Sequence, residues 1–304
     1  TLPQPLAKAL EDHGYTALTP VQASVSQPEA TGRDMIVSAQ TGSGKTVAFG
    51  LAIANELLGD LPTMPYTTAP LALVIAPTRE LALQVSRELM WLYAKAGARI
   101  ATCVGGMDAS KERRSLHHGA HIVVGTPGRL RDHLERGALD LSCLKGVVLD
   151  EADEMLDMGF KEDIDKILSD TPKDKNVWLF SATFPKDVER IARTYMNDPV
   201  EITIGSKNEA QKTIEHFSFL IHERDRYNAL KRLADANPSI FSVIFCRTKR
   251  DTQKVAELLI EDGYSAAALH GDLSQNQRDL VMKSFRNRQI QMLVATDVAA
   301  RGID

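Results

Sequence analysis

The stretch AQTGSGKT, residues 39–46, has the composition of a loop that binds phosphate. Gly42 and Gly44 let the backbone curl so that its N–H groups face an anion, and the helix expected next adds its dipole. Lys45 would reach the β- and γ-phosphates of a nucleotide, and the Thr46 hydroxyl would ligate Mg²⁺. The usual pattern begins with glycine, where an alanine stands here. The alternative is a glycine-rich strand-to-helix turn without a ligand, but Gly-Lys-Thr between a strand-like and a helical stretch favours phosphate binding.

A second candidate site is the acidic pair Asp150 and Glu151, which follows the apolar run GVVL. A carboxylate at the end of a buried strand can hold Mg²⁺ through water beside phosphates. Glu151 is placed to activate a water for attack on a γ-phosphate. Acids are also common at helix N-termini simply because they suit the helix dipole. Together with the phosphate loop, the pair predicts nucleotide hydrolysis, with Lys45, Asp150 and Glu151 as the catalytic residues.

Strand-like apolar runs alternate with amphipathic helical stretches through most of the chain. ALVIAP precedes the helical TRELALQVSRELMWLYAKAG, and GVVLD precedes one long helical stretch, EADEMLDMGFKEDIDKIL. This alternation predicts βαβ units, and therefore an α/β fold whose parallel sheets are covered on both faces. Ligands in such folds bind outside the carboxyl ends of the strands, so the functional residues are expected there.

The alternation is interrupted once, at the polar stretch GSKNEAQKT, and resumes with the strand-like runs HFSFLI, SVIFC, SAAALHG and QMLVAT. A chain of 304 residues is long enough for two domains that each bury a core. We therefore expect a first α/β domain over residues 1–204, a linker over 205–213 and a second α/β domain over 214–304.

Composition narrows the class of protein. Hydrophobic residues make up 43% and charged residues 25%, as in ordinary globular proteins, and the apolar runs are too short to span a bilayer. Cys103, Cys143 and Cys246 lie far apart without zinc spacing, which favours a reduced compartment and a cytoplasmic location. The net charge of −4 argues against coating nucleic acid by bulk attraction, although it leaves room for a local basic groove.

Further motifs follow in order along the chain: PTREL (77–81), GG (105–106), TPGR (126–129), DEADEMLDMGF (150–160), SAT (181–183), FCRT, HGDLSQNQR and ATDVAARGID. With these motifs the sequence resembles the DEAD-box ATP-dependent RNA helicase family over almost its whole length. The resemblance implies two tandem RecA-like parallel-sheet domains. The second is expected to be truncated at its C-terminal end, because no run of the form H-R-x-G-R-x-x-R occurs in the chain.

The resemblance also implies ATP and Mg²⁺ as cofactors, with the metal held by Thr46 and Asp150. Within GYTALTPVQ, the Gln22 amide could pair with the N6/N7 edge of adenine and Tyr15 could stack on the base. The alternative is a capped loop with a partly buried tyrosine. The acid that closes ARGID would contact the ATP ribose, or would be an ordinary acid in a turn. The implied nucleotide-binding residues are Tyr15, Gln22, Gln40, Thr41, Gly42, Ser43, Gly44, Lys45, Thr46 and Asp304.

RNA is the implied partner. Glycines and helix N-termini suit backbone phosphates and few aromatic residues are available for stacking, so binding would be largely independent of base sequence. Each of these residues alone could instead be a solvated or capping residue. The hydroxyls of Ser181 and Thr183 could bond Asp153 and couple the two sites, or satisfy local backbone. The implied RNA-binding residues are Pro77, Thr78, Arg79, Gly105, Gly106, Thr126, Pro127, Gly128 and Arg129, and then Arg247, Thr248, Gly271, Gln275, Arg278 and Thr296.

We therefore expect a monomeric, membrane-independent enzyme that binds single-stranded and duplex RNA and couples RNA-stimulated ATP hydrolysis to local separation of short duplexes. One alternative is an ATP-gated RNA clamp that does not hydrolyse. Another is a P-loop transporter or switch ATPase, whose L-S-G-G-Q signature or guanine-reading residues are not found here. Without the arginines of the H-R-x-G-R-x-x-R motif, these 304 residues alone are expected to bind nucleotide weakly and to hydrolyse it slowly.

Overall fold

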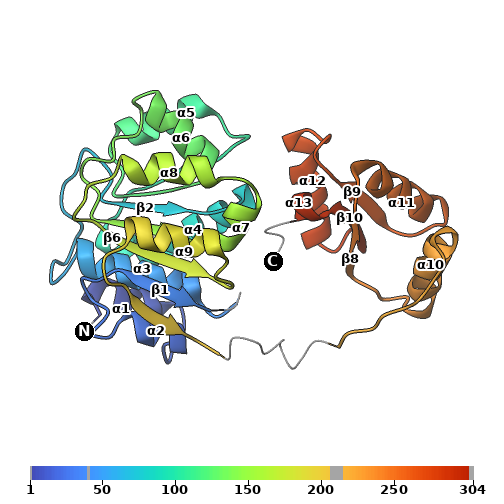
Figure 1. The fold of residues 1–304 in the computed structure, drawn as a ribbon, viewed down its shortest axis with the longest axis horizontal. Coiled ribbons are helices and arrows are strands. Elements are labelled where there is room, and N and C mark those ends of the chain that lie inside the picture. The colour runs from blue at the N-terminus through green and yellow to red at the C-terminus, as the bar shows by residue number, and fades with distance from the viewer. Residues whose placement is uncertain (1, 40–41, 206–214, 301–304) are drawn as a thin grey trace. The chain divides into compact units, whose positions relative to one another are not determined.

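The computed structural model describes residues 2–39, 42–205 and 215–300. The chain divides into two compact units, Thr1–Glu209 and Ala210–Asp304. Each unit is built around its own parallel sheet (Figure 1). The expected α/β class with two parallel sheets is therefore confirmed. Of the linker expected over 205–213, only residue 205 is among the described residues, so the bounds of the linker stay a prediction.

The first unit contains a seven-stranded sheet in the order β3-β4-β2-β5-β6-β1-β7, and every strand pairing in it is parallel. Its inner strands are short and apolar, and ALVI, IVVG and GVVL are buried at every position. Strands buried on both faces read as continuous apolar runs because helices cover each side. The strands are β1 (Met35–Ser38), β2 (Ala72–Ile75), β3 (Ile100–Cys103), β4 (Ile122–Gly125), β5 (Gly146–Leu149), β6 (Asn176–Ser181) and β7 (Val200–Thr203).

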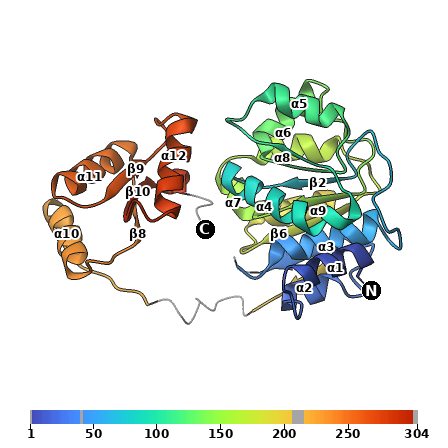
Figure 2. The same cartoon turned by 180° about the vertical axis from the view of Figure 1, so that it is seen from behind.

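Two helical layers enclose this sheet (Figures 1 and 2). Alternate residues of one strand enter different cores: Ala72 and Val74 of β2 join the first core, whereas Leu73 and Ile75 join the second. The first core is formed with α1 (Gln4–Asp12), α2 (Pro20–Val25), α3 (Lys45–Leu57), α4 (Arg79–Leu92) and the 3₁₀ turn η1 (Ala94–Ala96). The second is formed with α5 (Ala109–His117), α6 (Pro127–Glu135), α7 (Ala152–Asp157), α8 (Lys161–Ser169) and α9 (Lys186–Tyr195).

The prediction of one long helical stretch after GVVLD is wrong in one respect, because the structure has two helices there. Helix α7 ends before Gly159, whose φ of +86° lies in the left-handed region. The Gly159 N–H donates to the Leu156 carbonyl (3.0 Å), and the Phe160 N–H donates to the Met155 carbonyl (3.1 Å). This pair of bonds closes a helix C-terminus and favours glycine at the left-handed position. The direction of the chain therefore changes before α8 begins at Lys161.

The second unit contains a three-stranded parallel sheet in the order β8-β10-β9. Helices α10 and α11 share a core with one face of β10, and α12 and α13 share a core with the other. The elements are η2 (Glu223–Asp225), α10 (Arg226–Ala236), β8 (Ser242–Cys246), α11 (Lys249–Glu261), β9 (Ala266–Leu269), α12 (Gln275–Arg286), β10 (Met292–Thr296) and α13 (Asp297–Ala300).

The strand expected over HFSFLI, residues 216–221, is wrong. These residues carry no regular secondary structure, and Phe217, Phe219 and Leu220 are exposed. A β-strand needs a neighbour for its N–H and C=O groups, and none of the described strands pairs with this segment. Its apolar composition alone does not make it a strand.

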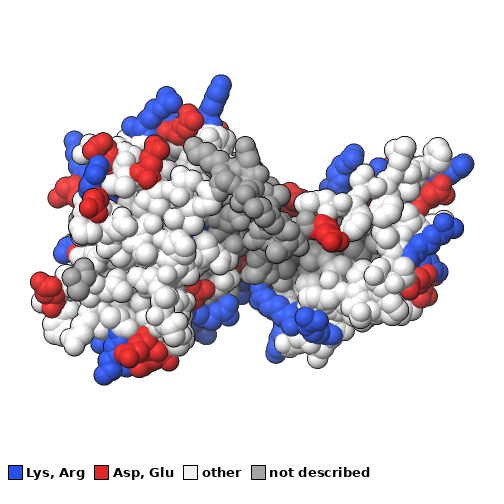
Figure 3. Space-filling model, turned by 90° about the horizontal axis from the view of Figure 1, so that it is seen from below, with Lys and Arg blue, Asp and Glu red and all other residues white. Residues whose placement is uncertain are grey.

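Within the described part of the chain, no helix has the length and apolar character needed to cross a bilayer. Figure 3 shows Lys and Arg side chains interspersed with Asp and Glu over the visible face of each unit. On that face neither sign of charge forms a broad continuous field, in keeping with the net charge of −4. On that face, attraction for a polyanion would come from particular residues rather than from a broad field.

Candidate functional site

The candidate residues of the first unit follow the carboxyl ends of strands. The order of the strands in the sheet therefore sets the order in which these residues lie along one edge. The phosphate loop follows β1, the SAT motif ends β6 and the acidic pair follows β5. PTREL, TPGR and GG follow the next three strands of the sheet, β2, β4 and β3. The nucleotide candidates thus occupy one half of the edge and the predicted RNA-binding residues the other half.

The phosphate loop is shaped by glycines and by the start of α3. Gly42 and Gly44 have φ values of +79° and +85°. A Cβ on Gly44 would lie 2.5 Å from Nε2 of Gln22, so no larger residue fits there without displacing that side chain. Lys45 opens α3 and is only 8% exposed, and Thr46 beside it is half-buried. The predicted loop residues Gln40 and Thr41 lie outside the described residues.

Gln22 supports the phosphate loop directly. Its Oε1 accepts from the backbone N–H of Thr19 (3.0 Å) at the start of α2, and its Nε2 donates to the Gly44 carbonyl (3.2 Å). The side chain is fully buried. The capping interpretation therefore describes this structure. These two bonds use one Oε1 lone pair and one Nε2 hydrogen, so the amide keeps a second acceptor and a second donor site, and the adenine contact stays a prediction. Tyr15 is half-buried, its ring centroid 6.1 Å from that of Trp91, and its place beside a base stays a prediction.

Asp150 lies directly after β5 and is buried. Burial raises the pKa of its carboxyl, and the nearby charge of Lys45 opposes that shift. One of its oxygens, Oδ1, is buried and has no hydrogen-bond partner among the described residues. Ser43 Oγ in the phosphate loop is also buried, and no described residue bonds it. Because buried polar atoms in folded proteins are nearly always satisfied, these atoms fit a site that receives a ligand, and a carboxylate oxygen suits a hard cation such as Mg²⁺.

Glu151 has an unusual backbone for a residue that is not glycine. Its φ of +52° places it in the left-handed region, where a side chain causes strain of about 1–3 kcal/mol. Burial, followed by the neighbouring charge of Asp150, raises the pKa of its carboxyl to about 7, while Lys45 opposes this. A carboxylate whose pKa lies near neutral pH is suited to accept a proton from water. Strain and a raised pKa therefore occur together at the residue predicted to act as the base.

Three hydrogen bonds join the acidic motif to the SAT motif, and a fourth lies within the SAT motif. The Asp153 carboxylate oxygen Oδ2 accepts from the hydroxyl (2.7 Å) and the backbone N–H (2.9 Å) of Thr183. The Ser181 hydroxyl accepts from the Asp153 N–H (3.2 Å) and donates to the Thr183 carbonyl (2.7 Å). Asp153 and Ser181 are both buried. The contact that the sequence left open between these hydroxyls and Asp153 is present, and its coupling role stays a prediction.

The three RNA-binding motifs predicted in the first unit lie against one another. Thr78 caps α4 by accepting from the Leu81 N–H (3.2 Å), and Arg79 donates to the Gly105 carbonyl (3.0 Å). Arg129 Nη1 lies 3.3 Å from Oε2 of Glu112 in a salt bridge. The other predicted residues lie at the same strand ends: Pro77 is buried and precedes the α4 cap, Gly105 and Gly106 are exposed, and Thr126, Pro127 and Gly128 begin α6.

In the second unit the predicted residues also follow strand ends, but several of them cap helices. Arg247 and Thr248 follow β8, and Thr248 accepts from the Asp251 N–H (3.0 Å) at the start of α11. Gly271 follows β9 after one residue. Gln275 and Arg278 lie on α12, and Thr296 ends β10, where its hydroxyl accepts from the Ala299 N–H. Asp304 lies outside the described residues.

Glu112 is a residue that the sequence interpretation missed. It stands in the strongly charged stretch DASKERR and reads as part of a solvated face, yet it is only 4% exposed. A signal was available, because Glu112 and the buried Leu116 lie four residues apart on one face of α5. An acid on the apolar face of a helix indicates a buried polar partner.

Comparisons with known proteins agree with this arrangement. The sequence model of the DEAD/DEAH box helicase family matches residues 19–191, and that of the helicase conserved C-terminal domain matches residues 225–304. The DEAD-box ATP-dependent RNA helicase CshA of Geobacillus kaustophilus is 43% identical over 303 residues, which are 100% of this chain and 64% of that protein. The CshA of Bacillus subtilis is 41% identical over 98% of this chain and 59% of that protein. The chain thus spans about three fifths of these relatives' length.

Solved structures give the same result. A DEAD box protein from the hyperthermophile Methanococcus jannaschii is 38% identical with a TM-score of 0.62, covering 100% of this chain and 80% of that one. A Saccharomyces cerevisiae Dbp5 variant bound to a Gle1 variant and IP6 is 28% identical with a TM-score of 0.72, covering 100% of this chain and 75% of that one. The resemblance found from the motifs is confirmed: the chain belongs to the DEAD/DEAH box helicase family.

Proposed function

We propose that this chain is the core of an ATP-dependent RNA helicase, which couples RNA-stimulated ATP hydrolysis to local separation or remodelling of short RNA duplexes. One observation carries the proposal. The strand order of the first unit places a phosphate loop and an acidic pair on the same sheet edge as PTREL, TPGR and GG. The bonds between Asp153 and Thr183 link neighbouring strands on that edge. A change at the nucleotide can therefore reach the rest of the edge through packed, hydrogen-bonded groups.

In the proposed nucleotide site, the N–H groups of the phosphate loop and Lys45 bind the β- and γ-phosphates. Thr46 and Asp150 would hold Mg²⁺, which when bound neutralises charge on the phosphate oxygens. Glu151 accepts the proton of the attacking water, in keeping with its pKa of about 7. In the same site Tyr15 and Gln22 would contact the adenine base and Asp304 the ribose. The remaining residues belong to the phosphate loop: Gln40, Thr41, Gly42, Ser43 and Gly44.

In the proposed RNA site, contacts are made chiefly to phosphates and are independent of base sequence. The mixed charges of the surface in Figure 3 support particular contacts over bulk attraction. For a single strand, the logarithm of affinity falls with the logarithm of salt concentration by about 0.7 per neutralised phosphate. We propose that the protein acts as a monomer in the cytoplasm, where its three free cysteines would remain reduced.

The test is RNA-stimulated phosphate release by the protein expressed from its complete reading frame. Lys45→Gln should abolish release, whereas Lys161→Gln, which removes the same charge from an exposed lysine, should not. Separation of a short labelled duplex should require ATP and be lost in the same variant. ATP-dependent RNA binding without RNA-stimulated phosphate release would replace the proposal with a non-hydrolysing RNA clamp.

A further inference from the structure

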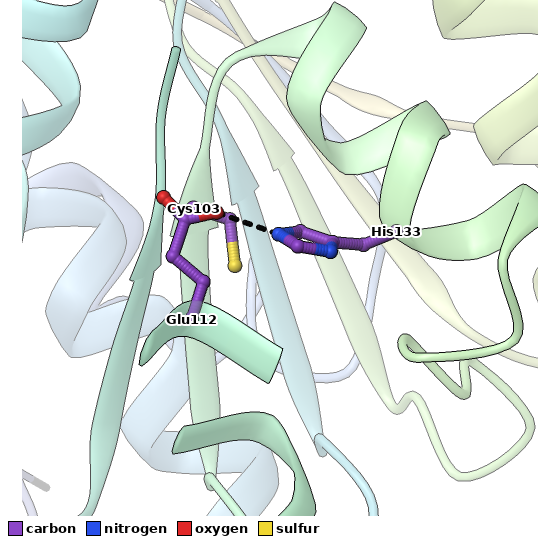
Figure 4. A group of neighbouring side chains, drawn as sticks. All are labelled: Cys103, Glu112 and His133. Carbon is purple, nitrogen blue, oxygen red and sulfur yellow. Dashed lines mark hydrogen bonds and ion pairs between the residues drawn. The ribbon is translucent and has the colours of Figure 1, made fainter. Parts of the chain in front are cut away.

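Three buried side chains that the proposed function does not use lie together beside β3. Figure 4 shows Glu112 of α5 and His133 of α6 pointing toward each other, with the Cys103 thiol from the end of β3 beside them. Glu112 is 4% exposed, and Cys103 and His133 are fully buried. A carboxylate buried this deeply must be paired and hydrogen-bonded to be tolerated.

The partners of the Glu112 carboxylate lie in or close to two of the motifs predicted to bind RNA. Its Oε1 accepts from the backbone N–H of Val104, which directly precedes the GG motif (2.9 Å). Its Oε2 accepts from Arg129 of TPGR (3.3 Å) and from Nε2 of His133 (2.6 Å). One carboxylate therefore ties the loop after β3 to the first turn of α6.

The loop after β3, Val104–Met107, is fixed at further points. Arg79 donates to the Gly105 carbonyl (3.0 Å), and Arg129 Nη2 lies 3.5 Å from the Met107 carbonyl. Two carbonyls of this loop therefore accept from arginines of the neighbouring motifs PTREL and TPGR. The first N–H of the loop, that of Val104, donates to Glu112. Glu112 is the buried member of this set, so its geometry is set by packing rather than by solvent.

The same three side chains have the donor types of a metal site, since their ligand atoms lie within 4.8 Å of one another. The contacts favour a hydrogen-bond network instead. Glu112 and His133 bond each other directly at 2.6 Å, and the Arg129 cation lies beside the carboxylate and would repel a metal ion. Burial and the charge of Glu112 raise the pKa of the Cys103 thiol to about 12, so the thiol stays protonated.

His133 supports this interpretation through its tautomer. A carboxylate only accepts, so Nε2 of His133 carries the proton that it donates to Glu112. The other ring nitrogen, Nδ1, is also buried, and it has no hydrogen-bond partner in the part of the chain that the structure describes. An unsatisfied buried nitrogen is unfavourable, so the contact with Glu112 is the interaction that accounts for a histidine at this position.

From these contacts we propose that Glu112 is the positioning residue of the RNA-binding edge: its buried carboxylate, oriented by His133, holds the Val104–Met107 loop and Arg129 in the arrangement that receives RNA phosphates. Glu112 itself does not touch RNA. The proposal rests on the proposed RNA binding by this edge. By its charge alone an acid would weaken the binding of a polyanion. The proposed role of Glu112 is the opposite, so it can be distinguished from a bulk electrostatic effect.

Glu112→Gln is the discriminating variant, because it keeps the size of the side chain and presents an amide N–H₂ to a site built around donors. Neutralising an acid should strengthen RNA binding if bulk charge dominates, and positioning predicts the opposite. Glu135→Gln is the matched control, since Glu135 is an exposed acid on α6 paired with Arg131. Affinity for a labelled single-stranded RNA is measured by fluorescence anisotropy with the full-length protein in the presence of ATP and Mg²⁺, and ATP affinity is measured separately.

We expect Glu112→Gln to weaken RNA binding about tenfold, the effect of a lost contact with a charged group. Glu135→Gln should bind RNA at least as tightly as the wild type, and ATP affinity should stay within about twofold in all proteins, because the phosphate loop lies at the other half of the edge. In an Arg129→Met background the Glu112 change should have little further effect, since the two residues act as one unit.

Several results would overturn this role. They are RNA affinity equal in the two glutamine variants, full additivity with Arg129→Met, a parallel loss of ATP affinity, or stoichiometric Zn²⁺ in the purified protein that Glu112→Gln removes. A wild-type protein that binds no RNA would overturn the proposed function as well. A wild type that binds RNA while Glu112→Gln behaves like its control would overturn only the role of Glu112.

Discussion

The candidate residues of the two units differ in how deeply they are buried. In the first unit, Lys45, Asp150, Asp153 and Ser181 are all buried, and helices enclose both faces of seven strands. In the second, a three-stranded sheet carries predicted residues that are exposed, such as Arg247 and Thr248. Most of the large exposed apolar side chains among the described residues also belong to the second unit, including Phe217, Phe219, Leu220, Phe241 and Phe245.

The two units thus differ in whether their candidate residues are buried or exposed, and the chemistry proposed for each residue depends on that. A base with a raised pKa and a strained backbone needs neighbours that hold it, and only the larger core of the first unit supplies them. Residues that contact RNA phosphates work at the surface and need only a helix start or a strand end to orient them.

Glu151→Gln should produce the largest effect, because the variant keeps the shape of the buried site but removes the proton acceptor. We expect kcat for RNA-stimulated ATP hydrolysis to fall by about 10²- to 10⁴-fold, with ATP and RNA binding retained. Steady-state phosphate release from the full-length protein measures this. Asp157→Asn is the matched control, since Asp157 is an exposed acid on the same helix. Turnover within a few-fold of wild type would remove Glu151 from its role.

The second prediction compares one residue type in the two sheets. Phe180 of β6 is fully buried, with its ring centroid 5.5 Å from that of Phe49, whereas Phe245 of β8 is 62% exposed. Phe180→Ala should lower the free energy of unfolding of the first unit by about 3–5 kcal/mol. Phe245→Ala should change that of the second unit by less than about 0.5 kcal/mol. Denaturant unfolding measures both, and comparable losses would show that the second sheet is as well enclosed as the first.

The third prediction tests whether the buried network of the first unit links ATP hydrolysis to RNA. Thr183→Val keeps the shape of the side chain but removes the hydroxyl that donates to Asp153 (2.7 Å). We expect the ratio of RNA-stimulated to unstimulated phosphate release to fall by about three- to tenfold, since the Thr183 N–H still donates to the same oxygen. Thr194→Val, an exposed hydroxyl on α9, is the control. An unchanged ratio would leave the SAT motif with a structural role alone.

The smallest effect concerns the pH dependence of stability. His121 is buried, accepts from the Arg99 N–H through Nδ1 (2.8 Å) and lies 3.0 Å from the Pro65 carbonyl through Nε2. Burial lowers its pKa below 6.5, with a smaller contribution from the charge of Arg99, and the bond to Pro65 opposes the shift. As pH falls through 6.5, the unfolded chain takes up a proton that the folded chain resists, so stability is complete above that pH and declines below it.

His121→Asn retains an acceptor for Arg99 and removes the titrating ring. The loss of stability between pH 7.5 and pH 5.5 should be smaller in this variant, by at most about 1.4 kcal/mol, because pH 5.5 lies one unit below the unfolded pKa. Thermal unfolding at the two pH values measures the difference. His117→Asn, an exposed histidine on α5, should leave the pH dependence as it is in the wild type. Equal slopes for His121→Asn and wild type would contradict the assignment.

The α/β class and the motifs that carry chemistry can be recognised in the amino-acid sequence alone. The buried strands are visible as runs such as GVVL, and the phosphate loop and acidic pair are visible as short patterns with fixed neighbours. These features are local, since each depends on residues that are adjacent along the chain. Two predictions made from local patterns are wrong. The helix after GVVLD is interrupted at Gly159, and HFSFLI is not a strand because it has no partner strand among those described.

Which motifs lie next to one another follows from the folded sheet and cannot be read from the sequence. The order β3-β4-β2-β5-β6-β1-β7 brings the GG loop beside Arg79 and Arg129, and it places the phosphate loop beside the SAT motif. The buried Glu112 and the contact of Gln22 with Gly44 also emerge only there. The physical reason is that these contacts depend on ladders between strands far apart in the sequence and on side chains packed from different helices. No short stretch of sequence specifies such contacts, because they form only when the whole sheet has been assembled and enclosed.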